Sequence, residues 1–388
     1  MKERMRLAAQ VIQQLESEGF DAYIVGGAVR NRYIGCPIKD IDITTSAPPA
    51  VITSLFYSFE TNAERHETVL VKLEDELFEV STFRAGGSGE YGLFEDLKRR
   101  DFTMNAIALS PDLDYIDPLN GRKDINARLI RAPEEPLKRF LEDPLRLLRA
   151  IRFIAQFNYR LETNTEQAVP AVKEDLQEVA LERVGQEFEE ILCSSFTDHA
   201  LQEAERLGII AIILPIQLEN VQYSFSKNEL IEREEHIAAF FISNQIGSVA
   251  AKQLLTGLKR SKALKQKVGK LITWFEWRSQ HGWDDESLYK AGLMQAIAVE
   301  RLLKACQFLN VAYDHEVKTR WDRLPIHTRT DLALNGADLI SLTGYQAGAW
   351  VNQWLYDLEV AILRRELSNT GEAVKDWVVQ RREEDESG

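Results

Sequence analysis

The sequence is poor in cysteine and lacks both a long apolar run and an excess of positive charge, and each absence excludes a class of protein. Three cysteines in 388 residues, odd in number and widely spaced, match neither a disulfide framework nor a zinc-binding pattern. No apolar stretch approaches the roughly 20 residues of a membrane-spanning helix, and the N-terminal residues show no secretory signal. We therefore expect a soluble cytoplasmic protein with no membrane partner and no evident protein partner.

The net charge of −14 argues against a protein that binds nucleic acid over its whole surface. It leaves room for local basic patches, which are what contact phosphate groups. A chain of this length can bury a large core and is expected to form more than one domain. Its first part mixes predicted strands and helices, whereas the residues after about 137 indicate one helix after another, without an internal repeat.

Residues 22–45 combine a glycine turn with a pair of carboxylates. The apolar run that ends at Val25 is followed by Gly26 and Gly27, a pattern that predicts a strand, a tight turn and a short helix. Glycine lets main-chain N–H groups approach a ligand, and the start of a helix attracts anions. Arg30 lies one turn into the helix, where it could pair with phosphate oxygens. A Gly-Gly pair by itself is mostly a turn.

Asp40 and Asp42 stand two residues apart at the next predicted strand. Alternate residues of a strand point to the same side, and two neighbouring carboxylates repel each other unless a cation lies between them. Mg²⁺ often binds one or two carboxylates together with substrate phosphates. Glu79, on a predicted strand over residues 77–83, is either a third carboxylate of the site or an exposed strand residue. A lone Asp-x-Asp is usually a solvated turn, so its combination with the glycine turn and Arg30 is what favours nucleotidyl transfer.

A basic segment precedes the predicted strand at residues 107–109. Arg100 is the last of three consecutive cations, and Asp101 and Asn105 follow it. Such cations often form only a solvated edge. Here they follow a glycine-rich loop over residues 84–97, which is expected to be mobile, and they precede side chains that can hydrogen-bond ribose hydroxyls.

A third informative stretch begins at Asp143, which has the pattern of a helix N-cap followed by proline at the first helical position. Arg146, Arg149 and Arg152 then recur every third residue and sweep round part of the helix. Three arginines on one flank without alternating acids make an unfavourable helix surface. They indicate anion binding, with a solvated surface as the alternative.

A second basic segment covers residues 259–270. A helix this rich in cations is suited to contact an RNA backbone, although a solvated face is about equally expected. The candidate RNA-binding residues are Lys259, Arg260, Lys262 and Lys265.

Taken in order, these segments resemble the motifs of bacterial class II tRNA nucleotidyltransferases, the CCA-adding enzymes of the polymerase-β superfamily. The resemblance spans nearly the whole chain, and the ordered set is specific although each motif alone is weak. It implies an α+β fold, in which a mixed-sheet nucleotidyltransferase head (1–136) precedes a helical neck (137–200), body (201–310) and tail (311–388). The motifs are residues 26–30 (GGAVR), 40–42 (DID), 100–106 (RDFTMNA), 142–146 (EDPLR) and 182–187 (ERVGQE), and residues 331–348 resemble the tail of the Gram-positive type.

The resemblance implies untemplated addition of nucleotides to the 3′ end of tRNA, from CTP, and from ATP in members that complete CCA, with Mg²⁺ and release of pyrophosphate. Asp40 and Asp42 would hold the metal ion. Asp143 and Arg146 would read the base, since an aspartate acceptor and an arginine donor can hydrogen-bond the edge of cytosine or adenine. The further nucleotide contacts would be Gly27 and Arg30 to the triphosphate, Arg100, Arg149 and Arg152, with Asp101 and Asn105 beside them.

The sequence departs from the family pattern at three places. Asn31 and Glu67 stand where Asp and Gly are usual. Full CCA-adding members also carry a longer loop after Arg84, thought to switch the pocket from CTP to ATP, and here only about ten residues separate Arg84 from Glu95. A shortened loop is typical of CC-adding relatives, so we expect addition of two cytidines. The Gly-Gly-Ser-Gly run of the loop also resembles an engineered linker, which leaves a designed deletion open.

Three alternatives stay open at this point. One is full CCA addition despite the short loop. A poly(A) polymerase shares the head but is expected to have a more basic C-terminal extension, whereas this C-terminus is acidic. A non-catalytic RNA-binding scaffold predicts loss of Asp40 or Asp42, and both are present. No His-Asp dipeptide occurs, so an appended phosphohydrolase module is not expected.

Overall fold

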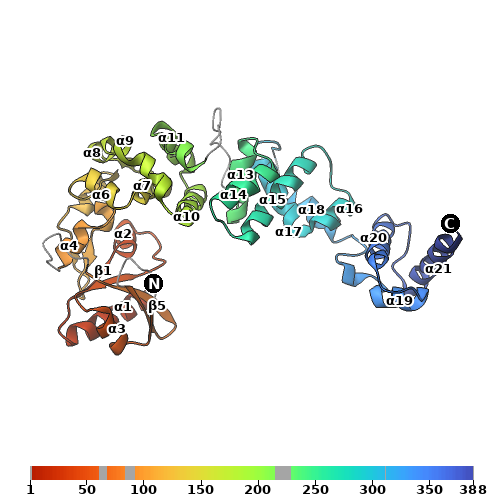
Figure 1. The fold of residues 1–388 in the computed structure, drawn as a ribbon, viewed down its shortest axis with the longest axis horizontal. Coiled ribbons are helices and arrows are strands. Elements are labelled where there is room, and N and C mark those ends of the chain that lie inside the picture. Colours follow the sequence, from red (N-terminus) through yellow and green to blue (C-terminus); the bar gives the residue numbers. More distant parts are fainter. Residues whose placement is uncertain (1, 61–67, 84–91, 215–228, 311, 388) are drawn as a thin grey trace. The chain divides into compact units, whose positions relative to one another are not determined.

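The computed structural model describes residues 2–60, 68–83, 92–214, 229–310 and 312–387. The chain forms two compact units, Met1–Gln217 and Leu218–Gly388, whose elements are drawn in Figure 1. Glu67 and residues 84–91 of the predicted glycine-rich loop lie outside the described residues. The prediction of a loop as far as residue 97 is wrong at its end, because Leu93–Lys98 form helix α4. The division into head, neck, body and tail is finer than these two units and stays a prediction.

The first unit contains a seven-stranded mixed sheet with the strand order β3-β4-β5-β2-β1-β6-β7. Strands β2 and β5 pair in parallel, and the other neighbours pair antiparallel. The prediction of an N-terminal mixed sheet followed by helices is confirmed. The strands are β1 (Ala22–Val25), β2 (Asp42–Thr45), β3 (Ser58–Glu60), β4 (Thr68–Leu73), β5 (Glu76–Thr82), β6 (Ala108–Leu109) and β7 (Tyr115–Ile116).

Helices cover the sheet, which is why consecutive residues of β2 are buried. Helix α1 (Lys2–Ser17) turns an apolar stripe toward the strands, and its Val11, Ile12 and Leu15 are fully buried. In Figure 1, α1 and α3 (Pro49–Leu55) lie on the opposite side of the strands from α2 (Gly27–Ile34). The glycine turn and α2 are thereby placed on one side of the strand that carries Asp42.

Short elements connect the sheet to a group of helices in the same unit. A second, two-stranded sheet joins β8 (Leu129–Ile130) to β9 (Arg160–Leu161) in parallel. The remaining elements of this unit are α4 (Leu93–Lys98), the 3₁₀ turn η1 (Thr103–Asn105), α5 (Gly121–Asn126), α6 (Pro136–Glu142), α7 (Leu145–Phe157), α8 (Thr163–Gln167), α9 (Val169–Val172), η2 (Lys173–Glu178), α10 (Leu181–Leu192), α11 (Thr197–Arg206) and α12 (Ile210–Ile213).

Within its described residues, the second unit contains helices joined by loops and no strands. None of the described helices, in either unit, has the length and apolar character needed to cross a membrane. The elements are α13 (Arg233–Ser243), α14 (Ser248–Gly257), α15 (Lys262–Arg278), α16 (Asp285–Ala291), α17 (Leu293–Ala305), α18 (Asp314–Trp321), η4 (Arg329–Asp331), α19 (Gly336–Thr343), α20 (Ala349–Leu363) and α21 (Gly371–Ser387).

The two units can be followed separately in unfolding experiments. All seven tryptophans lie in the second unit, where Trp274, Trp277 and Trp283 pack against one another. Tryptophan fluorescence therefore reports on the second unit, whereas the circular dichroism of the main chain reports on both.

The η1 turn carries Asn105 and is held from behind by α5. Thr103 Oγ1 donates a hydrogen bond of 2.7 Å to the buried Asp124, which also accepts from Arg131. Gly121 lies so close that a Cβ there would stand 2.1 Å from the main-chain oxygen of Thr103. Only a residue without a side chain lets α5 approach η1 in this way.

An alanine at position 121 should displace η1 and destabilise the first unit. Forcing a methyl group into a packed site costs about 1–3 kcal/mol, and in a unit of this size each kcal/mol lowers the melting temperature by roughly 2–4 °C. Circular dichroism of Gly121→Ala should show a lower melting temperature, with the tryptophan signal unchanged. Gly92→Ala is the control, because a Cβ there meets nothing within 4 Å. Equal melting of both variants would contradict this role of Gly121 in holding η1.

Candidate active site

The glycine turn meets a carboxylate and an arginine at a single point. Gly26 precedes α2 with a φ of 72°, a left-handed conformation that favours glycine. A Cβ on Gly26 would lie 3.0 Å from Asp42 Oδ2 and 3.2 Å from Arg100 Nη1. A Cβ on the next residue, Gly27, would lie 3.5 Å from Arg30 Nη2. The turn is therefore fitted closely around charged groups contributed by three other segments of the chain.

Three carboxylates gather at the edge of this turn. Asp42 is the first residue of β2 and pairs in register with Glu79 on β5, while Asp40 is exposed just before β2. Burial, together with the charge of Asp40, raises the pKa of Asp42, although Arg100 acts in the opposite direction. Burial and the charges of Asp42 and Asp40 likewise raise the pKa of Glu79. Asp40 thus disfavours ionisation of Asp42, and both disfavour ionisation of Glu79, a repulsion that a cation would relieve.

The donor set fits a divalent metal ion that is also bound by its substrate. Carboxylate oxygens are hard ligands, and Asp42 Oδ2 lies beside a glycine, where a Cβ would stand only 3.0 Å away. Within the described residues, no three His, Cys, Asp or Glu side chains are grouped so that they could hold a metal ion. Asp40 and Asp42 would need further ligands, which a nucleotide's phosphates can supply.

Arg30 is buried at the start of α2, 7 % exposed. Its Nε and Nη2 donate to Asn31 Oδ1 at 3.1 and 3.0 Å, and its Nη1 donates to Asn105 Oδ1 at 2.5 Å. The guanidinium also lies over the rings of Phe153 and Phe157, 5.1 and 4.8 Å from their centres. Burial lowers the pKa of Arg30 to about 10. The group still carries its charge near neutral pH.

Asp101 connects the η1 turn to helix α7. Its Oδ1 accepts from the N–H of Phe102 and from Asn105 Nδ2 at 2.8 and 2.9 Å. Its Oδ2 accepts from Arg149 Nε and Nη2 at 2.9 and 2.6 Å. Burial alone would raise the pKa of Asp101, but Arg149 and these hydrogen bonds hold it well below its usual range. Asp101 is therefore a permanently ionised anchor.

The arginine row of α7 finds its acidic partners on other elements. Arg149 pairs with Asp101 and lies 3.5 Å from Glu187 of α10. Arg152 Nε lies 2.9 Å from Glu187 Oε2, but the two atoms are not aligned for a hydrogen bond, and neither has another hydrogen-bond partner among the described residues. The spacing of residues along one helix reveals only acids on that same helix, so Glu187 of α10 was not predicted as a partner of these arginines. Its place in the ERVGQE motif was the available signal.

Arg146 faces a different set of partners. It is buried, and its Nη1 and Nη2 donate to the main-chain oxygens of Arg139 and Arg99 at 2.8 and 2.9 Å. Its carboxylate partner is Glu142, at 3.4 Å. Burial lowers the pKa of Arg146. Arg146 thus fastens α7 to α6 and to the segment that follows α4.

Asp143 lies between α6 and α7, where it is half-buried. Its Oδ1 accepts from the N–H of Leu145, the first residue of α7, at 3.3 Å. The prediction of Asp143 as the N-cap is wrong by one residue, because Pro144 is the N-cap of α7 and Asp143 is the C-cap of α6. Arg183 of α10 grips both carboxylate oxygens, with Nη2–Oδ2 at 2.8 Å and Nη1–Oδ1 at 3.3 Å. Arg183 was not predicted to have a role, because its partner lies 40 residues away.

Arg100 is oriented by Asp96, the buried acid one turn earlier. Its Nη2 and Nε lie 3.0 and 3.3 Å from Asp96 Oδ2. Arg100 was predicted from the sequence, but this partner was not. The structure therefore brings Gly27, Arg30, Asp42, Glu79 and Arg100 to one side of the sheet, and ties Arg30 to α7 through Asn105 and Asp101.

The predicted RNA-binding residues lie in the second unit, at and before the start of α15. Lys259 and Lys262 are exposed, and Arg260 and Lys265 are half-buried. Lys267, further along the same helix, pairs with Glu234 at 2.9 Å. A role of this segment in RNA binding stays a prediction.

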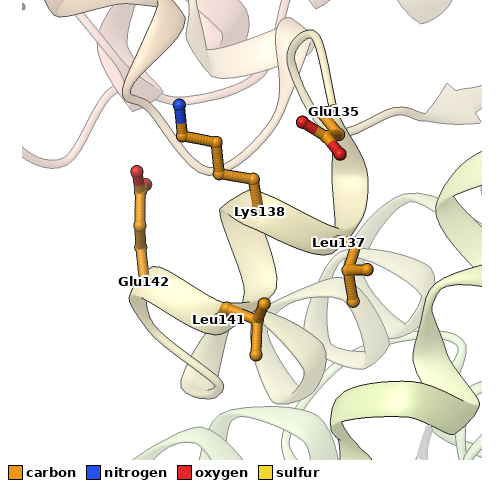
Figure 2. Close-up of a pocket in the computed structure, with 5 residues that line it drawn as sticks. All are labelled: Glu135, Leu137, Lys138, Leu141 and Glu142. Carbon is orange, nitrogen blue, oxygen red and sulfur yellow. The ribbon is translucent and has the colours of Figure 1, made fainter. Parts of the chain in front are cut away.

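A separate hollow of about 420 Å³ lies on α6 and is lined by Glu135, Leu137, Lys138, Leu141 and Glu142 (Figure 2). Figure 2 shows Lys138 and Glu142 extending from the helix away from Leu137. The carboxylate of Glu142 pairs with Arg139 and Arg146. The hollow therefore lies next to the ion pair between Glu142 and Arg146 of α7. The glycine turn, Asp40, Asp42 and Glu79 do not line it.

The fold and the grouping of glycine turn, carboxylates and arginines define a nucleotidyltransferase, and comparison with known proteins agrees. Three family models match: "Poly A polymerase head domain" over residues 22–131, "Probable RNA and SrmB- binding site of polymerase A" over 158–220, and "tRNA nucleotidyltransferase domain 2 putative" over 228–378. Together they follow the chain from the sheet into the second unit.

Full-length relatives identify the family. The chain is 34 % identical to the CCA-adding enzyme of Geobacillus stearothermophilus over 98 % of both chains, and 35 % identical to that of Bacillus cytotoxicus over 97 % of this chain and 98 % of the other. A crystal structure of the Bacillus stearothermophilus CCA-adding enzyme in complex with CTP covers 100 % of both chains with a TM-score of 0.89 and 34 % identity. The chain belongs to the family of bacterial CCA-adding enzymes, a family of tRNA nucleotidyltransferases.

Replacing the Asp101 carboxylate by an amide should destabilise the first unit in a pH-dependent way. Breaking a buried ion pair costs about 3–5 kcal/mol. Because the pKa of Asp101 is lowered in the folded protein, its ionised form stabilises the fold above the ordinary aspartate value of about 3.9, and this contribution is lost as the pH falls below that value.

Urea unfolding followed by circular dichroism should therefore show a large difference between wild type and Asp101→Asn from pH 8 to 5, shrinking below pH 4. Glu203→Gln is the control, since Glu203 pairs with the half-exposed Arg206 and such surface pairs contribute about 0–1 kcal/mol. A difference that stays constant down to pH 3 would contradict the ionised state assigned to Asp101.

Proposed function

We propose that the protein transfers cytidylate from CTP to the 3′-hydroxyl of a tRNA, releases pyrophosphate, and stops after two additions. The observation that carries the proposal is the meeting of Gly26, Asp42 and Arg100, since a Cβ on the glycine would lie 3.0 Å from Asp42 and 3.2 Å from Arg100. Phosphoryl transfer needs positioning and charge neutralisation more than covalent help. A glycine turn, a carboxylate and a cation at one point supply both.

The charge balance behind the turn favours an anionic ligand. Arg149 and Arg152 lie beside Asp101 and Glu187, with Glu190 also acting on Arg152, whereas the buried Arg30 forms no ion pair with a described residue. A triphosphate would supply the missing negative charge. The main-chain N–H groups at the start of α2 give this end of the helix a partial positive charge, which also favours binding of a triphosphate.

Asp40 and Asp42 are the proposed holders of Mg²⁺, with Glu79 as a third catalytic carboxylate beside Asp42. When bound, Mg²⁺ neutralises phosphate charge and favours ionisation of the attacking hydroxyl. The chain's own residues complete the arrangement. Gly27 and Arg30 would contact the triphosphate, and Arg100, held by Asp96, would contact the nucleotide near Asp42.

The base is proposed to be read by Asp143 and Arg146. A carboxylate oxygen accepts from the exocyclic amine of cytosine, and a guanidinium donates to its ring acceptors, whereas uracil lacks the amine. Arg149 and Arg152 would contact the nucleotide further along α7. Asp101 holds Arg149 in place, and Asn105 holds Arg30. Lys259, Arg260, Lys262 and Lys265 are proposed to bind the tRNA backbone.

Two cytidines are proposed rather than CCA because only ten residues separate Arg84 from Glu95. Complete CCA addition is the second candidate, and a specific observation favours it. The relatives that align with 97–98 % of this chain are named CCA-adding enzymes. Addition of the final adenosine from ATP therefore has to be tested directly.

The deciding experiment is a gel at single-nucleotide resolution of a tRNA that lacks CCA, incubated with Mg²⁺ and CTP, ATP or both. Growth by two residues, with no third when ATP is present, is the expected result. Growth by three would establish CCA addition, a long ladder with ATP alone would indicate a poly(A) polymerase, and no growth would favour an RNA-binding scaffold.

Asp42→Asn should lower the rate about 10²–10³-fold, the usual effect of removing one electrostatic group from the site. The exposed Asp112→Asn should not change it.

Arg183 should set nucleotide selectivity through Asp143. Without it the Asp143 carboxylate loses two charge-assisted hydrogen bonds and can rotate, so Arg183→Leu should lower kcat/KM for CTP about 10–100-fold, equivalent to roughly 1.5–3 kcal/mol. The discrimination between CTP and UTP should fall as well. Arg206→Leu is a matched control, because Arg206 is similarly exposed and also pairs with acids, Glu166 and Glu203. Unchanged CTP/UTP discrimination in Arg183→Leu would separate Asp143 from base reading.

A further inference from the structure

Arg30 differs from the other arginines of the site in the chemistry of its partners. Its guanidinium is held by the side-chain oxygens of Asn31 and Asn105 and by the faces of two phenylalanines. Arg100, in contrast, pairs with Asp96, and Arg149 pairs with Asp101. In the part of the chain that the structure describes, no carboxylate forms an ion pair with Arg30. A buried cation is thus held in position by neutral groups.

Arg30 keeps donors for a ligand. An arginine has five N–H donors, and the hydrogen bonds to Asn31 and Asn105 use Nε, one N–H of Nη1 and one of Nη2. Nη2 lies 3.5 Å from the position of a Cβ on Gly27, so the guanidinium reaches the glycine turn. Its unused N–H groups and its full charge are available there.

Asn31 makes a second contact that a carboxylate cannot make. Its Nδ2 donates to the main-chain oxygen of Pro37 at 2.9 Å, while its Oδ1 accepts from Arg30. The segment after Pro37 leads within three residues to Asp40. The two ends of one amide therefore connect the arginine of α2 to the chain that enters β2. An aspartate at position 31 would neutralise Arg30 and would turn an acceptor toward the Pro37 oxygen.

We propose that Asn31 is a positioning residue for triphosphate binding: its amide orients Arg30 without neutralising it and ties α2 to the segment that carries the metal-binding carboxylates. The inference rests on the proposed function, since it takes a nucleoside triphosphate as the ligand. It assigns a role to the residue at which this sequence departs from the aspartate usual in the family. Electrostatic attraction in a water-poor site is strong, so a charge that is left unneutralised contributes more to binding there than at the surface.

The test compares two variants that remove the amide in different ways. Asn31→Asp keeps the shape and adds a negative charge, whereas Asn31→Ala removes both hydrogen bonds without adding charge. For Asn31→Asp, the Kd of CTP measured by calorimetry should rise about tenfold, and KM for CTP should rise with kcat little changed. This is the pattern of a lost contact that binds ground and transition states equally. For Asn31→Ala, the rise should be smaller, about threefold.

Inorganic tripolyphosphate identifies the part of the nucleotide involved. Asn31→Asp should weaken its competition with CTP by the same factor as it weakens CTP binding. Asn126→Asp is the matched control: Asn126 is exposed on α5, bonds to Tyr33 OH, and gains the same charge in the same unit. It should bind both ligands like wild type, and circular dichroism should show that all variants are folded at the temperature of the assay.

The outcomes separate this inference from the proposed function. If wild type does not bind CTP, the proposed function fails and the inference fails with it. If wild type binds CTP but Asn31→Asp binds equally well, or Asn31→Ala is impaired as much as Asn31→Asp, the inference alone is overturned. A lowered kcat with unchanged KM, or unchanged competition by tripolyphosphate, also overturns it.

Discussion

The carboxylate of Asp101 is the group on which the rest of the site depends. It accepts hydrogen bonds from Asn105 and from Arg149, and each of these side chains continues outward. Asn105 reaches Arg30 in α2, and Arg149 reaches Glu187 in α10. A single buried anion therefore fixes the sheet side of the site and the helix side at once. A buried charge persists only where its partners compensate the loss of water, and Asp101 is compensated on both oxygens.

The same cluster is incomplete as a structural device. Arg30 forms no ion pair with a described carboxylate, and Arg152 and Glu187 approach each other without hydrogen-bond geometry. On the opposite side of the glycine turn, Asp40, Asp42 and Glu79 form a cluster of acids in which burial and mutual repulsion raise the pKa of Asp42 and of Glu79. The folded chain thus keeps neighbouring acids together and buries Arg30 without an ion pair of its own, at a cost in stability. A metal nucleotide carries both missing charges, cationic metal toward the acids and anionic phosphates toward the arginines, so the unfavourable electrostatics of the folded chain favour binding of that ligand.

Sequence patterns predicted the parts of this arrangement that are local. The sequence indicated a strand over residues 77–83, close to the observed β5, and a strand, turn and short helix that match β1 and α2. The partners could not be predicted in the same way, because Arg30 and Asn105 are 75 residues apart, and Arg149 and Asp101 are 48 apart. The arginine row of α7 illustrates the limit. The prediction that the arginine row has no acidic partners holds for α7 itself. Folding brings Asp101, which precedes η1, and Glu187 of α10 beside it. Arg30 of α2 still has no ion pair among the described residues, which is a property of the assembled site.

Arg146, the proposed base reader, shares one framework with the arginines proposed to bind phosphate. Two of its nitrogens are engaged by the main-chain oxygens of Arg139 and Arg99, and the second of these lies two residues before Asp101. A movement of Arg146 toward a base would therefore displace Arg99, at the start of the segment that contains Asn105, the partner of Arg30. Asp143, in contrast, is held by α10 through Arg183, outside that segment. The acceptor and the donor proposed to read one base edge are thus anchored to different parts of the unit. A base that fits both aligns α7 with α10 and with the η1 segment, whereas a base that satisfies one alone leaves a buried polar group without a partner.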